Sequence, residues 1–289
     1  MATTAPGDPR TPNEDSLAVC DDGSGLTAAV FDGITSLKST AGLNDETGAH
    51  FAAHFLKDAI PNIHSSDAMK ILIELNERLG AATKTIDGVD MCDTTTLPSS
   101  TATIIRVNRY RKSVTFGHIG DSFGIAYYTD GSSELFTDNR NESYDRKVLS
   151  LVRKIATQDG KTNRDARNDF RVALALIDMA KERNNSAAGN GSGCINGDSN
   201  AYRYIQSGHL ALDRLHSVLL GTDGLVPQDM SIKRGPDRNL LLTIISDAGF
   251  ANLMEIKRRS EDDDPDWRHL RYKHSDDATG ILVRFSNRT

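Results

Sequence analysis

The chain has 289 residues, 38% of them hydrophobic, and can therefore bury the core of one large domain or of two small ones. Its formal net charge of -6 argues against nucleic acid as a partner, because neutralising nucleic-acid phosphates requires clustered Lys and Arg. No apolar run is long enough to cross a membrane, so we expect a single soluble domain over residues 1–289 with no membrane partner.

The first hundred residues are predicted to form a β-hairpin followed by two helices. Short apolar runs at residues 16–20 and 26–31 flank the segment Asp-Asp-Gly-Ser-Gly, whose residue types tolerate turn geometry. Apolar residues then recur at helical spacing over residues 46–59 and 67–86. We expect these two helices to pack as one helical layer.

From residue 101 the pattern changes to β-rich runs separated by turn residues. We expect these runs to form an antiparallel meander. The predicted strands of the meander are residues 101–107, 113–119, 124–128 and 134–137.

The rest of the chain mixes helical and strand patterns. Helical spacing predicts helices over residues 144–157 and 165–183, and Asp237 can cap a helix that Gly249 breaks before a second helix runs to residue 259. Further strands are predicted at residues 202–206, 216–221 and 280–285. Strands and helices occur in blocks, which favours an α+β fold with antiparallel sheets covered by helices over a doubly wound parallel sheet.

The cysteines indicate the compartment. Cys20, Cys92 and Cys194 lie far apart and form no CxxC pair of the metal-binding type. Reduced thiols are the simplest state for such residues, and the N-terminal segment has no basic stretch followed by an apolar run. We therefore expect a cytoplasmic protein.

Five aspartates each lie at the edge of an apolar, strand-like run. They are Asp15, Asp32, Asp121, Asp223 and Asp276. If they met at one rim, each pair about 4 Å apart would repel by about 4 kcal/mol at an effective dielectric constant of about 20, so cations would be needed. Oxygen ligands without Cys or His suit Mg²⁺ or Mn²⁺ rather than Zn²⁺. A single Asp-Gly pair is typical of a simple turn, so the hypothesis depends on the whole set.

Six short motifs resemble those of the type 2C (PPM) family of metal-dependent protein phosphatases, and they follow the family's order. The motifs are Arg10-x-x-Asn13-Glu14-Asp15, Val30-Phe31-Asp32-Gly33, Ser100-Thr101-Ala102, Gly120-Asp121-Ser122, Thr222-Asp223-Gly224-Leu225 and Asp276-Asp277-Ala278-Thr279. They span nearly the whole chain, which resembles a short, bacterial-like catalytic domain. The resemblance implies a four-layer αββα sandwich of two antiparallel sheets flanked by helices, with a metal site at one end.

The resemblance also implies the metal ligands. Asp32 matches the family's bridging ligand, with the Gly33 carbonyl completing the shell of one ion. Asp223 and Asp276 match the ligands of the other ion. Asp121 matches an aspartate that can help to hold a third ion. The implied cofactors are therefore two Mn²⁺ or Mg²⁺ ions, with a possible third.

Three further residues have implied catalytic roles. Glu14 and Asp15 resemble the acidic pair that holds metal-bound waters. Arg10 lies five residues before Asp15, where the family places its phosphate-binding arginine, and the planar guanidinium of an arginine can donate two parallel hydrogen bonds to phosphate. The alternative for Arg10 is a solvated residue in a mobile N-terminal arm.

The implied activity is that of a Mn²⁺- or Mg²⁺-dependent protein-serine/threonine phosphatase. A water bridging two divalent ions would attack the phosphorus of phosphoserine or phosphothreonine. The implied partner is a phosphorylated protein, and we expect the enzyme to be a monomer. A variable, flap-like segment around residues 225–260 would choose the substrate.

The chain departs from the family pattern after Asp32-Gly33. Ile34 follows this pair where some members carry a histidine that protonates the leaving alkoxide, so water is the expected proton donor. His118 and His274 lie near motif aspartates and could be acids or structural residues. Two other functions stay open: a pseudophosphatase or regulatory binding module with the same fold, and a two-metal phosphodiesterase or nuclease, which the acidic charge disfavours.

Overall fold

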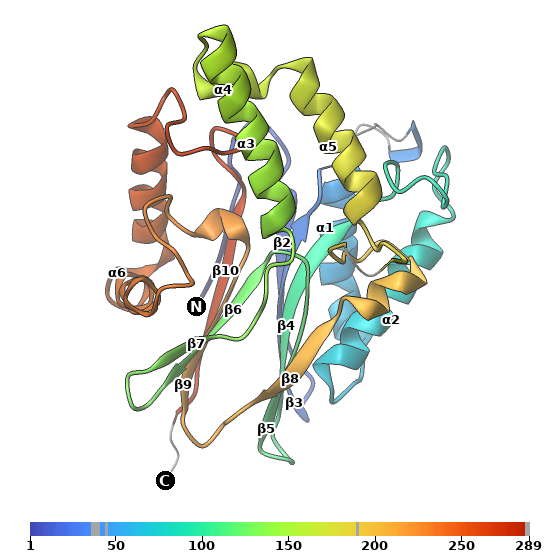
Figure 1. Ribbon diagram of the computed structural model, residues 1–289. Coiled ribbons are helices and arrows are strands. Elements are labelled where there is room, and N and C mark those ends of the chain that lie inside the picture. The colour runs from blue at the N-terminus through green and yellow to red at the C-terminus, as the bar shows by residue number, and fades with distance from the viewer. Residues whose placement is uncertain (36–40, 44–45, 189–190, 287–289) are drawn as a thin grey trace.

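The computed structural model describes residues 1–35, 41–43, 46–188 and 191–286. It contains two five-stranded sheets that lie face to face, with helices on both outer sides (Figure 1). All neighbouring strands are antiparallel. The first sheet has the order β2 (Asp15–Asp21), β3 (Gly25–Gly33), β4 (Ser100–Asn108), β5 (Ser113–Ile119) and β8 (Gln206–Leu210). The second has the order β1 (Ala2–Ala5), β10 (Ala278–Arg284), β9 (Leu215–Gly221), β6 (Phe123–Tyr128) and β7 (Ser133–Leu135).

Strand β3 shows why both sheets are buried on two faces. Its side chains alternate, because successive residues of a strand point to opposite sides of the sheet. Ala28 and Val30 pack between the sheets against residues of β9 such as Val218. Ala29 and Phe31 pack outward against the helices. The strand is therefore almost continuously apolar rather than alternating with polar residues.

Two helical layers cover the outer faces. Helices α1 (Gly48–Ala59) and α2 (Ala68–Thr83) cover the first sheet, and α6 (Gly235–Asp262) covers the second (Figure 1). The Asp67 carboxylate caps α2 by accepting hydrogen bonds from the first backbone N–H groups of the helix. The predicted break in α6 is confirmed, since Gly249 adopts a φ of 79° that only glycine tolerates well.

A third group of helices lies above one end of the sandwich, at the top of Figure 1. It is made of α3 (Glu142–Asp159), α4 (Asn163–Arg167) and α5 (Phe170–Arg183), which share a small apolar cluster that includes Val152 and Val172. Short 3₁₀ helices complete the described elements. They are η1 (Ala41–Leu43), η2 (Ile60–Asn62), η3 (Ser199–Arg203) and η4 (Asp223–Leu225).

The four-layer αββα sandwich predicted from the sequence is confirmed, and so is the first hairpin. The predicted meander is wrong. Strands β4 and β5 pair in the first sheet, but the chain then crosses at the Gly120-Asp121-Ser122 turn, so that β6 and β7 pair in the second. Gly120 has a φ of 100°, a conformation that lets the chain change direction there.

Smaller corrections concern the edges of elements. The helix predicted over residues 165–183 is divided into α4 and α5, because the Asp169 side chain caps a new helix at that point. The strand predicted at residues 202–206 is wrong, since η3 ends at Arg203 and β8 begins at Gln206. Strand β1 was not predicted, and it pairs with β10.

The segment around residues 225–260 contains most of α6. Its buried side chains, such as Leu241, Ile245 and Leu253, pack on the second sheet. The helices that lie above the end of the sandwich in Figure 1 are α3, α4 and α5, and the flap-like role of residues 225–260 stays a prediction. In the described part of the chain, no helix is both long enough and apolar enough to span a membrane.

Candidate metal centre

Strand register brings the predicted aspartates to one end of the sandwich. Asp15 lies directly opposite Asp32 in the pairing of β2 with β3. In the second sheet, Gly221 pairs with Gly280, so Asp223 follows β9 at the same end where Asp276 precedes β10. Residues far apart in the sequence therefore meet because antiparallel neighbours begin and end at the same rim.

A cavity of about 260 Å³ opens at this end. All five predicted metal-site residues line it: Asp32, Gly33, Asp121, Asp223 and Asp276. Its other wall comes from the helices above, with Asp145 of α3, Arg167 of α4, and Leu176 and Met179 of α5. The cavity thus has an acidic floor at the strand ends and a mixed roof.

The acidic floor is electrostatically strained. Burial, together with the charges of Asp15 and Asp223, raises the pKa of Asp32 well above its ordinary value. Burial, followed by the charges of Asp276, Asp121 and Asp145, raises the pKa of Asp223 to about 8. Ionised carboxylates held this close repel one another unless a cation lies between them.

Asp15 lies beneath the cavity and is buried. The Thr222 hydroxyl donates a hydrogen bond of 2.6 Å to its carboxylate, and the Thr222 side chain also accepts one from the Thr279 backbone. Burial raises the pKa of Asp15 well above its ordinary value. This hydrogen bond fixes the carboxylate between the two sheets.

Glu14 is held in a fixed orientation beside the cavity. Its carboxylate accepts hydrogen bonds from the hydroxyls of Thr47 (2.8 Å) and Thr35 (3.2 Å). Its backbone N–H donates to Asp277 at 2.6 Å, and Asp277 also accepts from the Gly7 N–H. Asp277 therefore ties the last motif of the chain to the first.

Asp121 and Asp145 occupy the side of the cavity next to α3. Asn141, at the start of this helix, donates a hydrogen bond of 2.5 Å to Asp121. Asp145 accepts from the Tyr272 hydroxyl at 3.2 Å. The sequence-based interpretation missed Asp145, because a carboxylate in the first turn of an amphipathic helix is indistinguishable from a solvated one.

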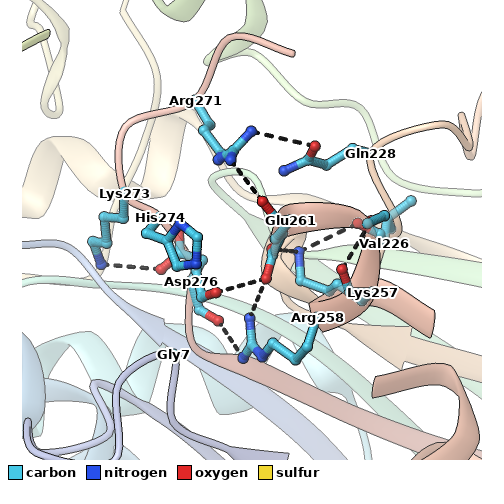
Figure 2. Close-up of polar contacts among 12 residues, drawn as sticks. Gly7, Val226, Gln228, Lys257, Arg258, Glu261, Arg271, Lys273, His274 and Asp276 are labelled. Atoms are coloured by element: carbon cyan, nitrogen blue, oxygen red, sulfur yellow. Dashed lines mark hydrogen bonds and ion pairs between the residues drawn. The ribbon is translucent and has the colours of Figure 1, made fainter. Parts of the chain in front are cut away.

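Lys273 is the second cavity residue that the sequence-based interpretation missed. Its ammonium lies 3.0 Å from the Asp276 carboxylate and 3.7 Å from that of Glu14. Figure 2 shows it pointing at Asp276. Burial opposes its charged form, but the carboxylates of Asp276 and Glu14 outweigh this and raise the pKa of Lys273 above its ordinary value. No local pattern in the sequence distinguishes this lysine from others.

Arg10 lies outside the residues that line the cavity. Its side chain is 86% exposed and forms an ion pair with Asp8 at 2.6 Å. The two candidate histidines are also elsewhere. His118 is fully buried, accepts or donates a hydrogen bond with Thr103, and has its pKa lowered to about 4 by burial. His274 is exposed and lies 3.0 Å from Asp262.

The donor set suits a hard divalent cation, because every predicted ligand that lines the cavity is an oxygen donor. The predicted ligands line the same cavity, but their side chains are not yet arranged around a single point. Within the described ranges, no three His, Cys, Asp or Glu side chains are already arranged to hold one ion. The residues present thus fit Mg²⁺ or Mn²⁺ in their chemistry, with Lys273 pairing one of the carboxylates.

Comparison with solved structures supports the fold. The chain is similar to the serine/threonine phosphatase Stp1 from Staphylococcus aureus, with 15% identity, a TM-score of 0.57, and coverage of 99% of this chain and 94% of that one. It is similar to the catalytic domain of the serine/threonine protein phosphatase PstP in complex with two manganese ions, with 16% identity, a TM-score of 0.53, and coverage of 98% and 96%. RsbX in complex with magnesium matches with 15% identity, a TM-score of 0.52, and coverage of 99% and 94%.

A search of curated proteins found no match for this sequence. The family model of protein phosphatase 2C matches residues 8–244, a span that includes Asp32, Asp121 and Asp223. Because this match covers most of the chain and the sandwich agrees with it, the chain belongs to the protein phosphatase 2C family.

Proposed function

We propose that this protein is a Mn²⁺- or Mg²⁺-dependent phosphatase that hydrolyses phosphoserine and phosphothreonine in proteins, as a monomer in the cytoplasm. One observation carries the proposal. All five residues predicted to hold metal line one cavity at the end of the sandwich. Burial and mutual repulsion raise the pKa of two of them, Asp32 and Asp223. This is expected of carboxylates that bind a cation when no cation is bound.

The ligands would divide between two ions. Asp32 would bridge them, the Gly33 carbonyl would complete one shell, Asp223 and Asp276 would hold the other ion, and Asp121 would help to hold a third. When bound, these ions would supply an activated water as the nucleophile and would neutralise charge on the transferred phosphoryl group.

The remaining residues would orient water molecules and the substrate phosphate, and would keep bulk water out of the cavity. Glu14 and Asp15 would hold water molecules, since both carboxylates are fixed by threonine hydroxyls. Arg10 would bind the substrate phosphate after exchanging its partner Asp8, with which it now forms an exposed ion pair. Leu176 and Met179 of α5 narrow the cavity and limit its access to bulk water.

Neither histidine that the sequence offered as the acid for the leaving alkoxide lines the cavity. Ile34, which lines the cavity, has no proton to give. Among the described residues, His118 is enclosed in the first sheet and His274 is paired with Asp262. We therefore assign protonation of the leaving group to water.

The test uses purified protein, an aryl phosphate and a phosphothreonine peptide, with and without Mn²⁺. Asp32→Asn should lower kcat/KM by more than about 100-fold, because a ligand contributes at least as much as the groups that orient it. Asp247→Asn, on the exposed side of α6, is the matched control and should leave the rate unchanged. Full activity in Asp32→Asn, or activity in excess EDTA, would overturn the proposal.

The ion pair between Lys273 and Asp276 favours one alternative, a pseudophosphatase that keeps the fold without turnover. In that case, the Lys273 ammonium would take the place of the metal ion that Asp276 is proposed to hold. Calorimetry would then detect binding of phosphopeptide, while none of the phosphopeptides would be hydrolysed. Turnover of a bis-aryl phosphate in preference to the peptide would indicate a phosphodiesterase instead.

A further inference from the structure

A cluster of buried charges lies at the end of α6, behind the acidic floor of the cavity. Glu261 is 2% exposed and Lys257 is 5% exposed, although both side chains are charged. Removing charged groups from water is costly, and an ion pair in such a place is often no more stable than apolar residues of similar size. The packing of α6 on the second sheet therefore does not explain the cluster.

The Glu261 carboxylate is the hub of the cluster (Figure 2). One oxygen lies 2.9 Å from the Lys257 ammonium. The other accepts hydrogen bonds from the Arg258 guanidinium at 2.9 Å and from the Ser275 hydroxyl at 2.7 Å. The carboxylate is thus bound on both sides, which fixes its position at the end of the helix.

From this hub, hydrogen bonds reach the two loops that carry Asp223 and Asp276. Arg258 donates at 2.8 Å to the backbone carbonyl of Asp276, and Ser275 is the residue before it. Lys257 donates at 3.5 Å to the carbonyl of Val226, which ends the turn that begins at Asp223. One helix end therefore contacts both loops.

The space between these loops and α6 is not filled by apolar side chains. A cavity of about 120 Å³ lies there, and its walls include Asp223, Asp276, Lys257 and Glu261. Leu225 and Val226 of the Asp223 loop belong to the apolar cluster of α6, and the polar contacts from the helix end add to this packing where the cavity interrupts it. Arg271 supports the same helix end by donating to the Glu261 backbone carbonyl at 3.2 Å.

We propose that Glu261 is a positioning residue of the metal centre, which holds the Asp223 and Asp276 loops through Lys257, Arg258 and Ser275. This inference rests on the proposed function, since it assigns those two aspartates to metal. Groups that orient metal ligands typically contribute 10- to 100-fold to metal affinity, in the range of about 1.4–2.7 kcal/mol.

The first experiment measures the affinity for Mn²⁺ alone by isothermal titration calorimetry. Glu261→Gln should raise the Kd for Mn²⁺ by about 10- to 100-fold. Glu255→Gln is the matched control on the same helix, because Glu255 forms only an exposed ion pair with Arg259. This control should bind Mn²⁺ as the wild type does. An unchanged Kd in folded Glu261→Gln protein would overturn the inference.

A second variant separates positioning from stability, since Glu261→Gln leaves the Lys257 charge buried and can unfold the protein. The double variant Lys257→Met with Glu261→Leu removes both buried charges and should keep a near-normal free energy of unfolding. It also removes the contacts to Ser275 and Val226. It should therefore fold and yet bind Mn²⁺ about 10-fold more weakly or worse. Wild-type affinity in this variant would overturn the inference.

Steady-state kinetics provide a further readout. In the double variant, the Mn²⁺ concentration for half-maximal hydrolysis of an aryl phosphate should rise in step with the Kd. At saturating Mn²⁺ the kcat should recover, because the ligands themselves remain. A kcat that stays low at saturating Mn²⁺ would contradict a role in positioning.

Two outcomes distinguish this inference from the proposed function. If the wild type binds no Mn²⁺, both are overturned. If the wild type binds Mn²⁺ and Asp223→Asn loses that binding while the Glu261 variants keep it, the proposed function stands and only the role of Glu261 is rejected.

Discussion

The two ends of strand β2 carry aspartates with opposite electrostatic environments. At one end, Asp15 lies opposite Asp32 without an arginine partner, and burial raises the pKa of both. At the other end, the Arg109 guanidinium beside Asp21 lowers the pKa of that carboxyl to about 2. Two aspartates six positions apart on one strand therefore differ: Asp15 faces another carboxylate at one rim, and Asp21 is neutralised by an arginine at the other.

The far rim also contains a buried arginine. Arg106 of β4 is 3% exposed and donates hydrogen bonds to Asp22 (2.8 Å), Ser24 (2.7 Å) and Thr27 (3.1 Å). This rim is closed by the chain's own cations. On the proposed function, the two rims have different roles: the rim whose aspartates pair with arginines stabilises the sandwich, whereas the rim where Asp15 and Asp32 have no arginine partner among the described residues gives up stability in order to bind an external cation.

The largest effect is expected at the closed rim. Arg106→Met should lower the free energy of unfolding by about 3 kcal/mol, because it removes the hydrogen bonds that the buried guanidinium donates to Asp22, Ser24 and Thr27. Urea denaturation would measure this as a lower midpoint with an unchanged slope. A loss below about 1 kcal/mol would break the comparison, since the far rim would then not be stabilised by its arginine.

Added metal should have the next largest effect. It should act at the rim where Asp15 and Asp32 lie, which we call the open rim. Mn²⁺ at 100 times its Kd should raise the free energy of unfolding by about 2.7 kcal/mol, because the ion binds the folded chain. Asp32→Asn should abolish this gain, and Asp21→Asn should retain it. Equal stabilisation of wild type and Asp32→Asn by Mn²⁺ would place the ion somewhere else.

Without metal, the open rim should show a pH dependence. The pKa of Asp223 is about 8 in the folded chain and 3.8 in its ordinary state, so the folded protein keeps a proton that the unfolded chain releases. Stability is therefore lost as the pH rises from about 4 to about 8. Asp223→Asn removes this titration. At pH 8 without metal, its free energy of unfolding should be higher than that of the wild type by on the order of 1–2 kcal/mol. Thermal unfolding at several pH values in EDTA would measure the difference, and parallel pH curves for the two proteins would contradict it.

The open rim was largely predictable from the sequence. Each aspartate there is adjacent to a short apolar run, and hairpin pairing fixes which strand ends meet. Antiparallel sheets covered by helices followed from blocks of strand and helix patterns, and the four layers followed from the resemblance to type 2C phosphatases. The assignment of β6 and β7 to the second sheet did not, because local patterns determine that a segment is a strand but not which sheet it joins.

The parts of the site that escaped prediction come from long-range packing. Asp145 reaches the cavity only because α3 lies above the strand ends, and Lys273 only because its loop returns to Asp276. Glu261 reads in the sequence as one of several acids at the end of a helix. None of these positions has a local spacing that marks it, so their roles depend on where the tertiary fold places them.

The smallest effect is expected for the second arginine of the closed rim. Arg109 lies 2.5 Å from Asp21, but its side chain is 52% exposed, and water already solvates both charges. Arg109→Ala should lower the free energy of unfolding far less than Arg106→Met does, and 1 M salt should remove most of that loss. Arg106→Met measured under the same conditions is the reference, because the two arginines neighbour each other on one rim and differ chiefly in burial. If Arg109→Ala cost as much as Arg106→Met, net charge rather than burial would explain the stability of that rim. The contrast with the open rim would then be one of charge balance alone.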